Sequence, residues 1–165
     1  MKNNKGYTLI ELMIVIAILG ILSGGVVVSI RNLSYANTIK TANSIHMAMK
    51  KLRLETMTKA EKQYLYLYKI DEAIYIKVST KDSGEEANLD ISSGTKISVR
   101  NSLYFYDRSE AKEMELENNN NNCFISFEKS SGAFSVESDY GIRIESSNKT
   151  AYIKCILETG RIEVK

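Results

Sequence analysis

Glu11 is the first residue of this sequence whose type and position indicate chemistry, because it is a carboxylate inside a long apolar segment. No charged residue follows it until Arg31, and an ionised carboxylate near the centre of a bilayer costs about 2.5–3.5 kcal/mol. One interpretation is structural, since an acidic side chain in the first turn of a helix interacts favourably with the backbone amides. The other is that Glu11 pairs with a cation.

Such a cation would arise if the chain were cut between Gly6 and Tyr7. The new α-amine would stand four residues before Glu11, on the same face of a helix. In an assembly this amine could belong to a neighbouring subunit. Opposite charges ~4 Å apart attract by about 4 kcal/mol at an effective dielectric of ~20, before desolvation is subtracted. Glu11 would then fix the register between subunits.

Two cysteines and one histidine are the other candidates for chemistry. Cys123 and Cys155 alternate in step with apolar neighbours, so we expect both to face the same core. In an oxidising compartment they would form a disulfide, and closing a loop of about 32 residues would stabilise the fold by roughly 3–4 kcal/mol; two buried free thiols are the alternative. His46 has no partner at a spacing typical of metal ligands or catalytic pairs.

The sequence does not resemble that of an enzyme. It contains no nucleophile paired with a base, no Gly-rich phosphate loop, and no CxxC or HExxH motif. We therefore expect no catalysis, no cofactor and no metal. The residues 110–122 are rich in carboxylates and amides, which suit calcium, but they lack EF-hand spacing and are typical of a solvated surface loop.

Composition excludes two further classes. The 22 basic and 20 acidic residues nearly balance, so no excess of positive charge indicates direct binding of nucleic acid. Disorder is excluded because 44% of the residues are hydrophobic, which is enough for a core. The length corresponds to a single domain.

The apolar segment around Glu11 has the length of a membrane span. As a helix, Tyr7–Ile30 would measure ~36 Å, and the hydrocarbon core of a bilayer is ~30 Å thick. Lys2 and Lys5 precede it, which predicts a cytoplasmic N-terminus and an extracytoplasmic domain from about residue 31 onward. A secretory signal cut near Ser23-Gly24-Gly25 is the alternative, although its apolar region is usually only ~7–15 residues long.

Hydrophobic periodicity predicts the elements that would follow this segment. A helical stripe indicates an amphipathic continuation of the helix over residues 31–62, and alternation indicates a β-rich domain over residues 63–165. The stripe consists of Leu33, Ala36, Ile39, Ile45, Met49 and Leu52. Strands are expected at 64–68 and 74–78, at 97–106 as a pair or one bent strand, and at 123–127, 134–137, 141–145, 152–157 and 161–164. In the first strand the tyrosines are expected on a half-exposed face. The predicted fold class is α+β, with the long helix packed on a mainly antiparallel β-domain.

Residues 5–22, KGYTLIELMIVIAILGIL, resemble the N-terminus of type IV prepilins and pseudopilins. The resemblance implies a leader of residues 1–6, cleavage after Gly6 by a membrane-embedded prepilin peptidase, N-methylation of Tyr7, and Glu11 as the assembly residue. It further implies storage of the subunit in the membrane and extraction into a helical filament by an ATP-driven inner-membrane platform. Other subunits, the peptidase, this platform and membrane lipid would be the partners.

The glycines and the lack of proline indicate how this N-terminal helix would pack and bend. Gly20 and Gly24 form a small-xxx-small pair that permits close helix packing. The chain has no proline, whereas many pilins kink this helix with one, so we expect a straighter helix with Gly24-Gly25 as its weakest point.

The C-terminal part carries a second resemblance. The order of Phe127, Gly132, Gly141-Ile142-Arg143-Ile144, Ile153-Lys154 and Thr159-Gly160-Arg161-Ile162 is similar to that in H-type minor pseudopilins of type II secretion and in related minor pilins. This similarity implies a subunit of a tip or initiation complex. A secretion pseudopilin, a competence pseudopilin and a minor pilin all remain open. The alternative function is a single-pass membrane-anchored receptor or adhesin that does not polymerise.

Overall fold

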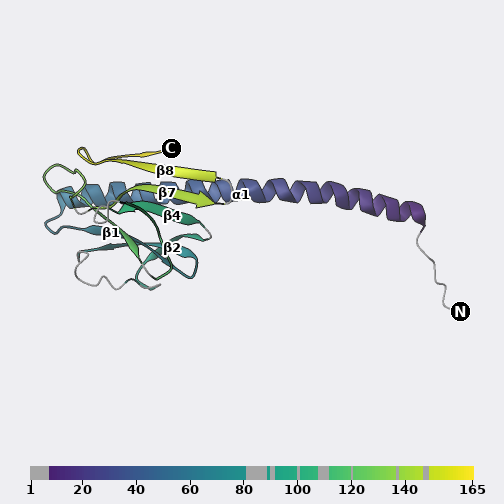
Figure 1. Ribbon diagram of the computed structural model, residues 1–165, viewed down its shortest axis with the longest axis horizontal. Helices are drawn as coiled ribbons and strands as arrows, with labels where there is room; N and C mark the ends of the chain where they lie inside the picture. Colours follow the sequence, from purple (N-terminus) through teal and green to yellow (C-terminus); the bar gives the residue numbers. More distant parts are fainter. Residues whose placement is uncertain are drawn as a thin grey trace.

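The computed structural model describes residues 8–80, 89, 92–99, 101–107, 112–119, 121–136, 138–146 and 149–165; for residues 24–34 it describes the helical backbone alone. One helix, α1 (Leu9–Thr58), leads into a β-domain. At 1.5 Å per residue its 50 residues span ~75 Å, and its first half projects away from the domain without a break (Figure 1). The fold is α+β, as the sequence predicts, and is consistent with a pilin-like fold.

The second half of α1 is amphipathic, but its buried stripe differs in part from the predicted one. The buried side chains are Thr38, Thr41, Ala42, Ile45, Met49, Leu52 and Thr56. Ala36 is exposed, contrary to the prediction, because it lines an open groove beside the domain. A search for apolar periodicity misses the threonines because their hydroxyls are polar. Burial is possible for Thr41 because its hydroxyl has a hydrogen-bond partner: Oγ1 donates to the Asn37 carbonyl at 2.8 Å. Leu33 lies outside the described side chains.

The helix ends at Thr58, earlier than the predicted boundary at residue 62. Lys59 turns to an extended conformation while its N–H still bonds to the Glu55 carbonyl at 2.8 Å. No glycine or proline marks this end, so the sequence pattern alone could not locate it.

The strands of the described residues form two sheets, and all strand pairs are antiparallel, as predicted. A four-stranded sheet has the order β3-β2-β1-β6. Its strands are β1 (Tyr64–Ile70), β2 (Ala73–Ser79), β3 (Thr95–Val99) and β6 (Asn122–Ser126). A five-stranded sheet has the order β5-β4-β7-β8-β9. Its strands are β4 (Ser102–Asp107), β5 (Lys112–Glu115), β7 (Tyr140–Ser146), β8 (Lys149–Ile156) and β9 (Arg161–Val164).

The prediction for residues 97–106 was wrong in one respect. β3 and β4 do not pair with each other, because the chain leaves one sheet and enters the other between them. Asn101 is buried at this crossing, and its Nδ2 donates to Thr41 Oγ1 of the helix at 3.1 Å. The crossing point is therefore anchored to α1.

Two other segments also differ from the expected pattern. Part of the expected loop 110–122 forms the edge strand β5, because Met114 packs on the core and Leu116 is buried. The expected strand 134–137 is reduced to an isolated bridge at Phe134; Glu137 lies outside the described residues. The residues after it close the free edge of β6 with their side chains, since Asp139 Oδ2 accepts from the Phe124 N–H at 2.7 Å.

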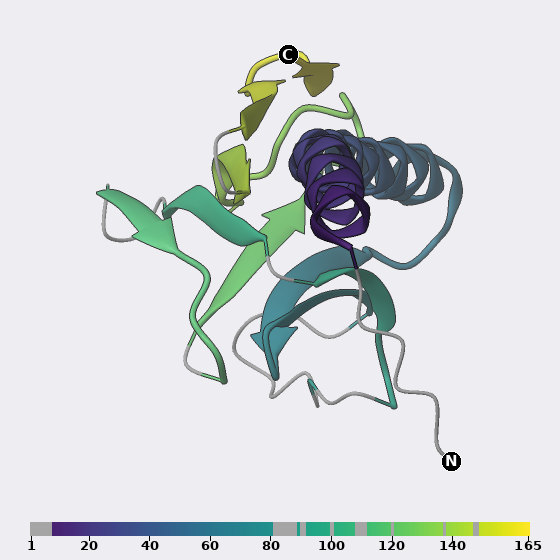
Figure 2. The same cartoon turned by 90° about the vertical axis from the view of Figure 1, so that its right-hand side faces the viewer.

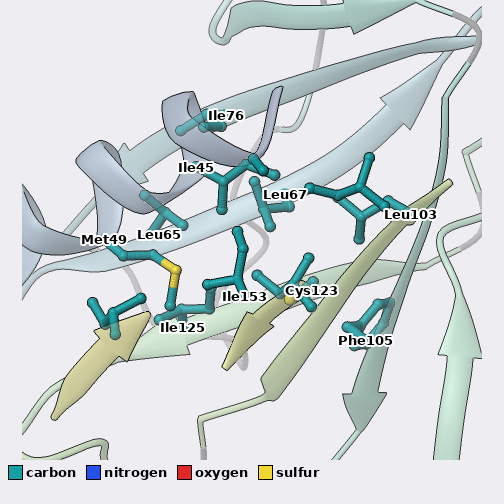
Figure 3. Packing of buried hydrophobic residues seen from close by; sticks show 14 of the residues in the cluster. Ile45, Met49, Leu65, Leu67, Ile76, Leu103, Phe105, Cys123, Ile125 and Ile153 are labelled. Atoms are coloured by element: carbon teal, nitrogen blue, oxygen red, sulfur yellow. The ribbon is translucent and has the colours of Figure 1, made fainter. Parts of the chain in front are cut away.

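The main core lies where α1 meets the two sheets (Figures 2 and 3). Ile45 and Met49 of the helix pack with residues from both sheets, among them Leu67 of β1 and Ile153 of β8. The opposite face of the four-stranded sheet carries a second cluster around Tyr66, Tyr68, Tyr75 and Phe124. Tyr66 and Tyr68 are therefore buried and not half-exposed as expected. Leu89 packs against this cluster.

An arginine clamp joins the end of α1 to two turns of the β-domain. Arg53 Nε donates to the Gly132 carbonyl at 2.8 Å, and Nη2 donates to the Thr159 carbonyl at 2.9 Å. Gly132 and Gly160 both have positive φ, and a Cβ on Gly160 would stand 1.8 Å from the Gly132 oxygen. These turns therefore require glycine for space as well as for conformation.

Candidate functional site

The N-terminus of α1 contains a complete capping box at the position of the predicted assembly residue. Thr8 is the N-cap, and its backbone N–H and its hydroxyl donate to Glu11 Oε2 at 2.8 and 2.9 Å. In return, the Glu11 N–H donates to Thr8 Oγ1 at 3.3 Å. The structural interpretation of Glu11 is therefore confirmed, since the carboxylate satisfies backbone donors of its own helix. Gly6 and Tyr7, the predicted cleavage and methylation residues, lie outside the described residues.

One oxygen of the Glu11 carboxylate takes no part in this cap. Both hydrogen bonds to the carboxylate end on Oε2, and Glu11 is exposed, so Oε1 has no partner among the described residues. A cation from another molecule can approach this oxygen while the cap stays intact. The geometry is thus compatible with both interpretations of Glu11 at once.

Residues 9–23 of α1, apart from Glu11, are apolar on every side of the helix, and no other part of the described chain covers them. Their large apolar side chains are each more than half exposed, from 51% for Ile18 to 78% for Leu9. They are Leu9, Ile10, Leu12, Met13, Ile14, Val15, Ile16, Ile18, Leu19, Ile21 and Leu22. Since fully burying such a side chain contributes about 1.5–3 kcal/mol, covering this surface is worth on the order of 10 kcal/mol. A helix that is apolar all round belongs in lipid or among other helices.

Across the side chains that the structure describes, no helical stretch is both long and apolar enough to span a membrane. The predicted span Tyr7–Ile30 includes residues 24–30, whose side chains are not described. Of the predicted packing glycines, Gly20 has open space around the position of a Cβ, with no atom within 4 Å. Gly24 and Gly25 belong to the helix but lie in the segment described by its backbone alone.

A groove that sequence reasoning missed runs along the second half of α1. It has a volume of about 1170 Å³ and lies between the helix, from Tyr35 to Glu55, and strands β2 and β3. Its apolar wall includes Met47, Val78 and Ile97, and Met47 is 69% exposed. We call it the α1–β3 groove. Sequence patterns cannot reveal it, because its two walls come from segments that only the tertiary structure brings together.

Two lysines stand together at the end of this groove closer to the first half of α1. Lys40 of the helix and Lys96 of β3 line both the α1–β3 groove and an adjoining pocket of about 250 Å³. The pocket also contains Asn37, Thr41 and Ser98. Within the described part of the chain neither lysine has an acidic partner, unlike Lys51, which lies 3.9 Å from Glu55. The groove therefore combines an apolar wall with unneutralised positive charge.

The cysteines face one core, as predicted, but are not bridged. Cys123 on β6 is buried in the main core and Cys155 on β8 packs against it; the structure holds both as free thiols. In the structure the two cysteines are therefore free thiols, the second of the two alternatives, although they lie near enough for Cys155 to raise the pKa of Cys123. Burial raises the pKa of the Cys155 thiol to about 11 and raises that of Cys123 well above its usual range. Both behave as small apolar groups at neutral pH.

The remaining candidates have structural roles or none that the structure reveals. His46 Nε2 lies 3.2 Å from the Ile162 carbonyl, and the tautomer with its proton on Nε2 donates to this oxygen and so links α1 to β9. Over the described ranges no group of three or more His, Cys, Asp or Glu residues is placed to hold a metal ion.

Comparison with known proteins gives one match, and it falls on the N-terminus. Residues 1–27 match the family model of the prokaryotic N-terminal methylation motif. No curated protein and no solved structure matches the chain significantly. The matched residues contain Gly6, Tyr7 and Glu11, together with all of the exposed apolar helix, residues 9–23. The match therefore supports a type IV pilin-like substrate of prepilin peptidase.

Proposed function

We propose that this protein is a structural subunit, a minor pilin or pseudopilin, of a type IV pilus-like or type II secretion-like filament. The observation that carries the proposal is the exposed apolar surface of residues 9–23 of α1, which lie within the matched methylation motif. A folded domain that presents about 20 Å of fully apolar helix needs either lipid or neighbouring helices to cover it. A filament subunit uses both in turn, first in the membrane and then in the assembly.

The processing roles follow from the matched motif. Gly6 would be the recognition residue before the cut, and Tyr7 the methylated new N-terminus. Cleavage would remove Lys2 and Lys5, which leaves equal numbers of basic and acidic side chains. Gly20, Gly24 and Gly25 would allow neighbouring helices to approach closely.

We place the subunit first in the cell membrane, with the N-terminus cytoplasmic and the β-domain extracytoplasmic, and then in the filament. Its partners would be other pilin or pseudopilin subunits, prepilin peptidase, the inner-membrane platform and membrane lipid. The C-terminal resemblance favours a minor subunit at a tip or initiation complex. The residues that carry this resemblance include Gly132 and Gly160, and Arg53 ties their two turns to α1 through the Gly132 and Thr159 carbonyls.

A membrane-anchored receptor or adhesin that does not polymerise is the second candidate function. It is favoured by the capping box, because a cap alone gives Glu11 a sufficient structural reason. An anchored receptor needs neither cleavage after Gly6 nor an interaction of Glu11 with another subunit. The two functions therefore differ in processing.

The deciding experiment is the intact mass and N-terminal sequence of the protein from membranes with and without prepilin peptidase. We expect loss of residues 1–6 and gain of one methyl group on Tyr7 only when the peptidase is present. A Gly6→Ala variant serves as the uncut control within the same membranes. An uncut chain with the peptidase present, or a cut near Ser23, would overturn the filament proposal.

A further inference from the structure

The α1–β3 groove and residues 9–23 of α1 are complementary in character. This exposed helix, Leu9–Ser23, is apolar with Glu11 as its single charge. The groove has an apolar wall and, at one end, Lys40 and Lys96 without an acidic partner among the described residues. The groove therefore offers the exposed helix an apolar surface to cover it and two cations for its carboxylate.

The two surfaces also agree in length. Successive subunits of a helical filament are related by a rotation and a shift along its axis, so helices close to that axis run parallel to one another. Placing Glu11 of one copy beside Lys40 of another staggers the helices by about 29 residues, or ~43 Å. The segment 9–23 then lies alongside residues 38–52, which fall within the groove between Tyr35 and Glu55.

The side-chain spacing along the helix fits the same stagger. Residues that share the face of Glu11 recur at helical spacing, and their counterparts in the other copy line the groove. The facing pairs are Glu11 with Lys40, Val15 with Ser44, Ile18 with Met47, and Leu22 with Lys51. Ile18 and Met47 are both exposed, at 51% and 69%, so each would gain cover from the other.

From these observations we propose that the α1–β3 groove of one subunit receives the Leu9–Ser23 helix of a second copy, with Glu11 of that copy beside Lys40 and Lys96. The inference rests on the proposed filament function and names the cation that Glu11 meets. Glu11 Oε2 keeps its bonds to Thr8, and Oε1 faces the two lysines. The α-amine of Tyr7 is then not required as the partner of Glu11.

Cysteine crosslinking in filaments tests the stagger. The full chain carrying Ile18→Cys and Met47→Cys is expressed in cells with the assembly machinery, oxidised, and analysed for covalent dimers without reductant. The matched control pairs Ile18→Cys with Leu54→Cys. Leu54 is 64% exposed, but its side chain does not line the groove and it lies seven residues, or ~10 Å, beyond Met47 along the helix. The single variant Ile18→Cys controls for bonds to the native cysteines.

We expect a covalent dimer for the Ile18–Met47 pair and none for the Ile18–Leu54 pair or the single variant. A second variant, Lys40→Gln with Lys96→Gln, should lower incorporation into filaments roughly tenfold, the size that two partly screened ion pairs give. Both lysines are exposed, so this variant leaves the core unchanged.

The outcomes separate this inference from the proposed function. If the chain is cut after Gly6 and enters filaments but the Ile18–Met47 pair does not crosslink, the docking is overturned while the filament function stands. The same holds if the double lysine variant assembles normally, which would point to the α-amine of Tyr7 as the partner of Glu11. If the chain is neither cut nor assembled, both proposals fall together.

Discussion

The two roles of Glu11 can be separated by substitutions that remove one and keep the other. Glu11→Gln keeps an acceptor for the Thr8 N–H, because glutamine also completes a capping box, but it removes the charge. Thr8→Ala removes the side-chain acceptor of the cap and keeps the charge. Glu11→Ala removes the charge and the acceptor for the Thr8 N–H, but residue 11 keeps its backbone N–H bond to Thr8 Oγ1. The three variants together assign the effect to the cap or to the charge.

The structure sets the magnitude of each effect. Loss of the Thr8 cap should cost about 1 kcal/mol of helix stability, and this cost is confined to the first turn. Loss of the Glu11 charge removes its ion pairs with Lys40 and Lys96 of the neighbouring subunit, so it should lower incorporation roughly tenfold, as the double lysine variant does. The charge should therefore matter more than the cap for assembly, whereas membrane insertion should be nearly unaffected by either.

The assay compares the amount of each variant in membranes with the amount in sheared filaments from the same cells. We expect Thr8→Ala to assemble close to the unaltered chain. Both Glu11→Gln and Glu11→Ala should fall roughly tenfold in the filament fraction while remaining in the membrane. Normal assembly of Glu11→Gln together with a defect in Thr8→Ala would refute the reasoning. Glu11 would then act only as a helix cap.

Three further predictions concern the β-domain of the full chain in detergent. Gly160→Ala should destabilise the fold by about 1–3 kcal/mol or more, because its φ is +65° and a Cβ would collide with the Gly132 carbonyl; thermal unfolding measures this, and an unchanged melting temperature would contradict it. Arg53→Ala should lower the free energy of unfolding by about 2–3 kcal/mol through loss of two bonds to turn carbonyls, to be read from urea unfolding against the exposed control Lys50→Ala. Alkylation of Cys155 should be very slow at pH 8 and accelerate toward pH 11, because its raised pKa keeps the thiol protonated in the folded chain. The rate of labelling is followed by intact mass, and fast labelling at pH 8 would show that the thiol is more accessible than in the structure.

Most element positions could be predicted from the sequence, because local periodicity decides them. The alternation at 64–68 and 74–78 predicted β1 and β2, and the short runs near the C-terminus predicted β7, β8 and β9. The prediction failed at segments whose structure depends on contacts with residues far away in the sequence. β5 depends on burial of Leu116, and the edge of β6 is closed by the Asp139 side chain in place of a strand.

The same division holds for the candidate site. The sequence identified Glu11 and its two interpretations, since both a capping position and a lone carboxylate in an apolar segment are local features. The sequence could not show that Oε1 of Glu11 has no partner within its own helix cap. Nor could it show that Lys40 and Lys96 line the same groove beside an apolar wall. Those facts depend on how α1 lies against β3, far from it in sequence.

The sequence by itself determined the apolar helix, its acidic residue and the methylation motif, because these depend only on residue types at fixed spacing along one helix. The tertiary structure alone decided which helical face is buried, which sheet each strand joins and where the α1–β3 groove opens. The physical reason is that α1 packs chiefly on the five-stranded sheet, through β7, β8 and β9, so that its opposite flank stays open beside β2 and β3. That choice follows from the sum of many side-chain contacts across the chain and is visible in no single stretch of it.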